Sequence, residues 1–229
     1  MRVLIAVFAM IWGGTAAAAE LEAGRLTVTG EGRIASVPDM ATITLGVVHE
    51  APTAAVALDA ASAATGAVLD GLAADGVAAR DIQTRDLALR PVWSNRSSTT
   101  GSPPRITGFQ ASNTVVVRVR DLDALGGILD RVVSRGANLF QGLSFGLQDP
   151  APLQDRARRD AVAEAQRRAR LYADAAGLTL GPVLLLNEAG TSPVPVQMLR
   201  LEAMEDAVPI AQGEVRTTAS VTMVFAIGP

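Results

Sequence analysis

Two short motifs in this chain contain residue types that could do chemistry. The first is GEGRIA, Gly30 to Ala35, followed by an acidic residue, Glu50, about twenty positions after the first glycine. Glycines at this spacing with a later acid are typical of a dinucleotide-binding loop. The second is GLSFG, Gly142 to Gly146, which spells the nucleophile elbow of serine hydrolases around Ser144. Either motif indicates an enzyme only if the surrounding elements position it correctly.

The residues after GEGRIA do not form the helix that a dinucleotide-binding loop needs. Ser36, Val37 and Pro38 follow directly and lead into 41–47, where strict alternation predicts a half-buried strand. A pyrophosphate would be held by a helix N-terminus at this place, and Glu50 ends the next strand with no crossover helix before it. We therefore expect no cofactor, and we interpret the glycines as points of local twist or close backbone approach.

The second motif also lacks the setting that its chemistry requires. Ser144 lies within an alternating stretch rather than on a strand-to-helix turn, and the single histidine, His49, precedes it in the chain. Because triads are defined by geometry, a serine hydrolase using Ser144 and His49 stays as a minor alternative. One histidine and no cysteine argue against zinc, and Asp121 and Asp123 are better explained by helix capping and solvation. The sequence predicts no metal and no enzyme.

Composition excludes further classes of protein. The chain has 20 basic residues, all of them arginine, against 23 acidic residues, for a net charge of −3. This balance argues against nucleic-acid binding, which requires a basic surface. The absence of lysine excludes Schiff-base chemistry and a phosphate-loop lysine. The absence of cysteine excludes disulfides and a thiol nucleophile, so stability must rest on packing.

The N-terminus has the pattern of an export signal. Arg2 precedes an apolar run from Val3 to Trp12, and small residues lead up to Ala19. The run is about half of the roughly 20 residues needed to span a bilayer. We predict a cleaved signal peptide at 1–19 and a mature domain at 20–229. No later segment is comparably long without charges, so we expect no transmembrane segment after cleavage.

Hydrophobic periodicity predicts an α+β fold with mostly antiparallel strands and three main helices in the order ββαββαβαββ. The predicted strands are 26–34, 41–47, 82–93, 106–120, 138–148, 183–186 and 215–226, and the predicted helices lie within 52–75, 121–136 and 150–176. Pro91 indicates an edge position, and the segment 189–213 is predicted to be irregular.

The longest predicted helix, 150–176, has an apolar face made mainly of small residues. The face consists of Leu153, Ala157, Ala161, Ala165, Ala169, Tyr172 and Ala176. Small residues allow close approach, so we expect this helix to lie tightly against a sheet, or alternatively against another protomer. Its opposite face alternates arginines with acids at i,i+4 spacing, which favours a solvated surface.

Five segments of the chain, taken in order, resemble the SIMPL-domain family. They are GEGRIASVPDMATITLGV, DIQTRDLALRP, GFQASNTVVVRVRDLDALGGILDRVVSRGAN, DAVAEAQRRARLYADAAGL and PIAQGEVRTTASVTMVFAI, and together they cover nearly all of the mature chain. Gln212 stands where a proline is expected before the glycine. The family includes bacterial periplasmic and outer-membrane-associated immunogenic proteins and an oxidative-stress defence protein. The resemblance implies an exported, self-assembling α+β protein and supplies no catalytic residues.

We therefore predict a non-enzymatic periplasmic protein, with a potential outer-membrane association, that forms a homo-oligomer and contributes to envelope maintenance or oxidative-stress tolerance. The alternative is a module that binds a periplasmic ligand or an envelope protein partner. The segment 189–213 is predicted to form the contact between protomers. The alternative is that this segment is an Ω-like loop folded on its own domain. The candidate contact residues are Pro193, Pro195, Met198, Leu199, Leu201 and Met204.

Overall fold

A computed structural model describes residues 24–94, 103–196 and 210–229 of the chain. Within these residues the helices and strands follow in the predicted order, which confirms the α+β class. The elements are β1 (Gly24–Ser36), β2 (Met40–Ala51), α1 (Ala54–Ala74), a 3₁₀ turn η1 (Ala79–Asp81), β3 (Ile82–Trp93), β4 (Ile106–Val119), α2 (Leu125–Ser134), β5 (Leu139–Gly146), α3 (Ala151–Ala176), β6 (Thr179–Val196) and β7 (Glu214–Gly228).

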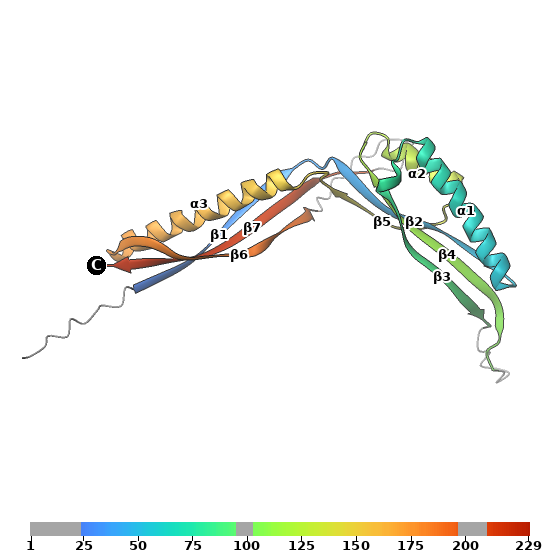
Figure 1. Ribbon diagram of the computed structural model, residues 1–229, viewed down its shortest axis with the longest axis horizontal. Coiled ribbons are helices and arrows are strands. Elements are labelled where there is room, and N and C mark those ends of the chain that lie inside the picture. The colour runs from blue at the N-terminus through green and yellow to red at the C-terminus, as the bar shows by residue number, and fades with distance from the viewer. Residues whose placement is uncertain (1–23, 95–102, 197–209) are drawn as a thin grey trace, which may run out of the picture.

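The strands form two antiparallel sheets, and each sheet carries helices on one face (Figure 1). The first sheet has the order β1-β7-β6 and is covered by α3, whereas the second has the order β3-β4-β2-β5 and is covered by α1 and α2. Residues 37–39 and 147–150 connect the two parts, and the molecule is elongated and bent between them. We call the parts the three-stranded half and the four-stranded half.

In the three-stranded half, α3 lies very close to β1 because both contribute small residues. A Cβ atom added to Gly32 would lie 1.9 Å from the carbonyl oxygen of Ala157, and one added to Gly30 would lie 2.1 Å from that of Ala161. Only glycine permits this approach, so the predicted role of the two glycines is confirmed. The buried face of α3 consists of Ala157, Ala161, Ala165, Ala169 and Ala173. This face packs on the chain's own sheet.

The four-stranded half has a core of large aliphatic side chains instead. Ile43 and Leu45 of β2 lie beneath Leu72 of α1 and Ile128 of α2, and all four are at most 2% exposed. The remaining fully buried members of this core are Ala41, Val47, Val68, Val115, Val117, Val119, Leu125 and Val132. Burying a large aliphatic side chain contributes about 1.5–3 kcal/mol, so this half holds most of the hydrophobic stabilisation.

By length and composition, α1 is the one helix in the described part of the chain that could cross a membrane. Its buried residues include Ala57, Val68 and Leu72, which pack on β2 and β4 as part of the core. The core helix of a folded domain passes the same test, so packing on the sheet explains the apolar character of α1.

Three of the differences between the predicted and the observed boundaries have a clear physical reason. β6 continues to Val196 and pairs with β7 up to that residue, with three register shifts along the way, although 189–213 was predicted to be irregular from its first residue. β6 tolerates prolines because it is an edge strand, so only one side of its backbone must pair with a neighbouring strand. α1 begins after Thr53, whose hydroxyl accepts from the amide of Val56, rather than at Pro52. α2 begins at Leu125, because Asp121 accepts from the nearby amide of Asp123 and caps a turn.

A partly buried ion pair and a short hydrogen-bond chain hold the junction between the halves. Arg120, just after β4, donates from Nε and Nη2 to the carboxylate of Asp81, both at 2.7 Å. Its Nη1 donates to the side-chain oxygen Oε1 of Gln148 at 3.1 Å, and the backbone amide of Gln148 donates to the carboxylate of Asp39 at 2.7 Å. Since Asp39 and Gln148 lie in the two connections between the halves, this network fixes both connections to the four-stranded half.

Candidate functional site

His49 and Ser144 both lie in the four-stranded half but far apart. In the ladder between β2 and β5, Ser144 is opposite Thr42, and His49 follows seven residues later along β2. At about 3.3 Å per strand residue, this separation is about 23 Å. A nucleophile and its base must lie within hydrogen-bond reach, so the geometry does not support the serine hydrolase alternative.

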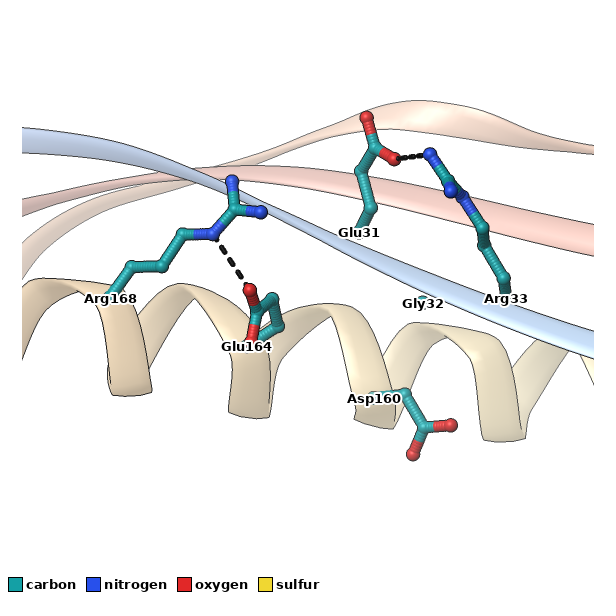
Figure 2. Close-up of a pocket in the computed structure, with 6 residues that line it drawn as sticks. All are labelled: Glu31, Gly32, Arg33, Asp160, Glu164 and Arg168. Atoms are coloured by element: carbon teal, nitrogen blue, oxygen red, sulfur yellow. Dashed lines mark hydrogen bonds and ion pairs between the residues drawn. The ribbon is translucent and has the colours of Figure 1, made fainter.

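A shallow charged depression of about 410 Å³ lies between β1 and α3 (Figure 2). Glu31 pairs with Arg33 on β1, and Arg168 Nε donates to Glu164 at 2.7 Å on α3. Arg168 Nη1 also donates to the carbonyl of Thr29 on β1 at 2.9 Å. This last contact fastens the edge of α3 to β1. We therefore assign the depression a structural role.

The acid at the centre of this depression is held in its ionised form. Two hydrogen bonds from Arg167, followed by the bond from Arg168, lower the pKa of Glu164 to about 2. A carboxyl group with this pKa is a poor proton donor near neutral pH. Within the described ranges, moreover, no three His, Asp or Glu side chains gather into a group that could hold a metal ion.

A more distinctive surface lies on the edge strand β6. Its residues Val183, Leu184, Leu185 and Leu186 are consecutive and between 44% and 58% exposed. We call these four residues the β6 apolar strip. α3 lies mainly over β1 and β7, so it leaves β6 uncovered (Figure 1). An exposed, apolar edge strand is a template for pairing with another chain.

Tyr172 of α3 extends this apolar surface. Arg158 of α3 reaches across to Glu188 of β6 at 2.9 Å, which shows which side of the helix faces β6. Tyr172 follows Arg158 by nearly four helical turns and therefore lies on the same side. The rise of about 21 Å along the helix places it near Val183, because β6 runs back antiparallel to α3. Tyr172 is 54% exposed.

The edges of the two sheets differ in charge. On the outer strands β1 and β3 the exposed charged residues are Arg25, Glu31 and Arg33, and Arg85, Asp86 and Arg90, respectively. β5 has no charged residue, and β6 has only Glu188, which pairs with Arg158. Charged side chains on an edge strand oppose pairing with another chain. Each sheet therefore has one protected edge, β1 or β3, and one unprotected edge, β6 or β5.

An apolar groove lies beside the unprotected edge of the four-stranded half. It has a volume of about 260 Å³ and opens between α2 and the start of β5. Phe140 of β5, 55% exposed, and Val133 of α2, 65% exposed, form its rim. The floor includes Leu45 of β2 and Val132 of α2. We call this feature the α2–β5 groove.

The sequence-predicted contact residues fall only in part within the described chain. Pro193 and Pro195 belong to the edge strand β6, opposite Thr217 and Val215 of β7. Met198, Leu199, Leu201 and Met204 lie outside the described residues. Sequence reasoning did identify Val183–Leu186 as a short apolar strand, but it missed the exposure of all four side chains. Two cues were present, the uninterrupted apolar run and the prolines on either side of it.

Comparison with known proteins supports the resemblance seen in the sequence. The model of the SIMPL family, described as a protein of unknown function (DUF541), matches residues 26–225. The chain is 36% identical over 211 residues to the 26 kDa periplasmic immunogenic proteins of Brucella melitensis and Brucella abortus, with 89% of this chain and 84% of each relative covered. It is 29% identical over 220 residues to the uncharacterized protein YggE of Escherichia coli K12, with 96% and 87% covered. The chain therefore belongs to the SIMPL family.

Proposed function

We propose that this chain is a non-enzymatic periplasmic protein that self-assembles and thereby contributes to envelope maintenance or oxidative-stress tolerance. The periplasmic location is supported by the name of the Brucella relatives and by the export signal predicted at 1–19. The observation that carries self-assembly is the β6 apolar strip, which leaves four consecutive aliphatic side chains exposed on an unprotected strand edge.

Two physical terms favour assembly through the strip. Removing apolar surface from water contributes about 25 cal/mol per Å². A second chain that pairs with β6 would also satisfy backbone groups on the side of the strand that faces away from β7. Neither term requires a catalytic residue, a metal ion or a cofactor.

The strip can be tested with a matched pair of leucine variants. Leu186→Glu places a charge in the strip, whereas Leu171→Glu places the same charge on α3, away from β6. The two leucines are similarly exposed, at 51% and 55%. The mature chain is measured by light scattering behind a sizing column over a wide concentration range. We expect oligomers for the wild type and Leu171→Glu and a monomer for Leu186→Glu.

Two results would contradict the proposal. A monomeric wild type at every concentration would remove self-assembly. Equal masses for the wild type and Leu186→Glu would remove the strip as its cause. Circular dichroism of both variants shows whether each is folded before the masses are compared.

The physiological part needs a separate test. A strain that lacks the protein is challenged with peroxide and with detergent, and each variant is supplied in trans. We expect the wild type and Leu171→Glu to restore growth and Leu186→Glu to fail at equal abundance. Full rescue by a folded, monomeric Leu186→Glu would separate the stress role from assembly and overturn the link between them.

A further inference from the structure

The two unprotected edges belong to different sheets, and each carries exposed apolar residues. We infer that β6 of one copy pairs with β5 of a second copy, so that the β6 apolar strip lies over the α2–β5 groove. This inference rests on the proposed self-assembly and names the two surfaces that meet. The occupant of the groove is therefore the strip of another copy of this chain.

The charges on the strands favour this pairing. Joining β6 to β5 would give one continuous sheet across two copies, in the order β1-β7-β6-β5-β2-β4-β3. Both unprotected edges become internal in this sheet. The two strands left at its outer edges, β1 and β3, are those that carry Arg25, Glu31 and Arg33, and Arg85, Asp86 and Arg90. Charged outer strands oppose the addition of a further strand to either edge of this shared sheet.

The groove matches the strip in polarity. Phe140, like Leu45 opposite it, lies on the helix-covered face of its sheet, and the groove opens there between Phe140 and Val133. Aliphatic side chains of the strip protrude from β6, so one of them can enter the groove while the backbones pair. Neither surface contributes a charged side chain to the contact.

The strip cannot fill the groove of its own chain. Within one molecule, β6 approaches β5 at the end of β6 that carries Val196 (Figure 1). Leu186 lies about 33 Å upstream along the extended strand. The strip is therefore available only to a neighbouring copy.

The prolines of β6 limit where pairing can occur. Proline has no N–H to donate, and Pro182 and Pro193 lie on either side of the strip. Between them all residues keep their backbone donors, although the ladder to β7 shifts register at Leu184 and again between Glu188 and Thr191. The strip and its nearest neighbours thus form the part of β6 best suited to pair with a partner strand.

A contact between two different surfaces has a consequence that a symmetric contact lacks. Each copy would offer one donor edge, β6, and one acceptor edge, β5, so copies would join head to tail into a ring or an open chain. A symmetric contact of β6 with β6 would instead leave β5 free. A substitution that damages β5 should weaken the head-to-tail contact and leave the symmetric contact unchanged.

The test mixes two variants that each damage one surface. Phe140→Glu damages the acceptor edge, and Leu186→Glu damages the donor edge. We expect each variant alone to assemble at least about tenfold more weakly than the wild type, because a charge must be buried at the contact. In an equimolar mixture one intact donor meets one intact acceptor. We therefore expect dimers that contain one copy of each variant, and no larger species, in native mass spectrometry.

Three results bear on the inference. Oligomers of Phe140→Glu equal to those of the wild type would overturn it and leave self-assembly through β6 standing. A mixture that stays monomeric would also overturn it. Heterodimers would support it. If Phe140→Glu does not fold, Phe140→Ala replaces it, because that change only trims a half-exposed ring and the same mixing result is expected with a weaker block.

Discussion

In the three-stranded half, α3 lies against β1 through alanines and glycines, whereas in the four-stranded half α1 and α2 pack large aliphatic side chains on β2 and β4. The first contact depends on the absence of side chains at the closest points, since a single Cβ at Gly30 or Gly32 would overlap the backbone of α3. The second contact depends on large side chains that fill the space between the helices and the sheet. The two halves should therefore fail under opposite kinds of substitution.

The difference extends to the surface. α3 packs closely on β1 and β7 through small side chains, so the outer strand β6 stays uncovered and its apolar strip is exposed. In the four-stranded half two helices share one sheet face, and the exposed large apolar residues are spread over α1, β3, the start of β4 and the rim of the α2–β5 groove. Close helix packing in one half thus goes together with an open strand edge.

Adding volume to the three-stranded half should have the largest effect. Gly32→Val would force α3 away from β1, because the new Cβ would lie 1.9 Å from the Ala157 oxygen. We expect the free energy of unfolding to fall by about 4 kcal/mol or more, measured by urea titration. The control is Gly142→Val in β5, where an added Cβ has no atom within 4 Å. A loss at Gly32 no larger than at Gly142 would refute the close-packing interpretation.

Removing volume from the four-stranded half should have the next largest effect. Leu72→Ala deletes a fully buried side chain of α1 and should lower the free energy of unfolding by about 3 kcal/mol. The matched change in the other half is Ala161→Gly in α3, where the expected loss of about 1 kcal/mol comes mainly from helix propensity. Similar losses in the two variants would show that the halves do not differ in the way we describe.

The ion pair at the junction should make stability depend on pH. Hydrogen bonds from Arg120 lower the pKa of Asp81, so its contribution to stability is complete above the unfolded pKa of about 3.9. This contribution is lost as the pH falls through the lower pKa of the folded state. Arg120→Ala should therefore cost about 2 kcal/mol near neutral pH, and the difference from the wild type should shrink below about pH 4.

Urea titrations between about pH 2 and pH 7 measure this difference, with Asp81→Asn as the control. Asp81→Asn keeps the shape of the side chain but cannot ionise, so its variant should lack this part of the pH dependence. A wild-type advantage over Arg120→Ala that stayed constant across the whole range would contradict the assignment.

The smallest effect should be a gain. Gly66 lies within α1, and a Cβ added there meets no atom within 4 Å. Gly66→Ala should raise the free energy of unfolding by about 0.5–1 kcal/mol, because alanine restricts the unfolded chain and favours the helix. The same urea titration applies. A loss of stability would mean that Gly66 serves a close contact of its own.

The fold could be predicted largely from the sequence because each element has a clear period and clear ends. The alternation in β2 and β4 and the alanines of α3 at every fourth position are local signals, and Gly177 ends α3 with the positive φ expected of a cap. The course of β6 was missed because prolines and glycines read as loop residues. Its strand character depends on pairing with β7, which is a non-local contact.

The candidate site was harder to predict for the same reason. An apolar run such as Val183–Leu186 is typical of a buried strand, and its exposure follows from the edge position of β6 and from the width of α3. The α2–β5 groove joins residues from β2, α2 and β5, and no local pattern contains them together. The separation of His49 and Ser144, in contrast, agrees with the sequence argument that GLSFG lacks the setting of a nucleophile elbow.

Hydrogen–deuterium exchange of the mature wild-type protein tests most directly whether the unprotected edges carry assembly. Exchange is followed peptide by peptide at low and at high protein concentration. We predict that peptides containing 183–187 and 139–145 exchange more slowly at high concentration, because their edge amides become paired, while peptides of β1 and β3 do not change. Concentration-independent exchange in 183–187, or equal slowing in β1 and β3, would contradict assembly through the unprotected edges.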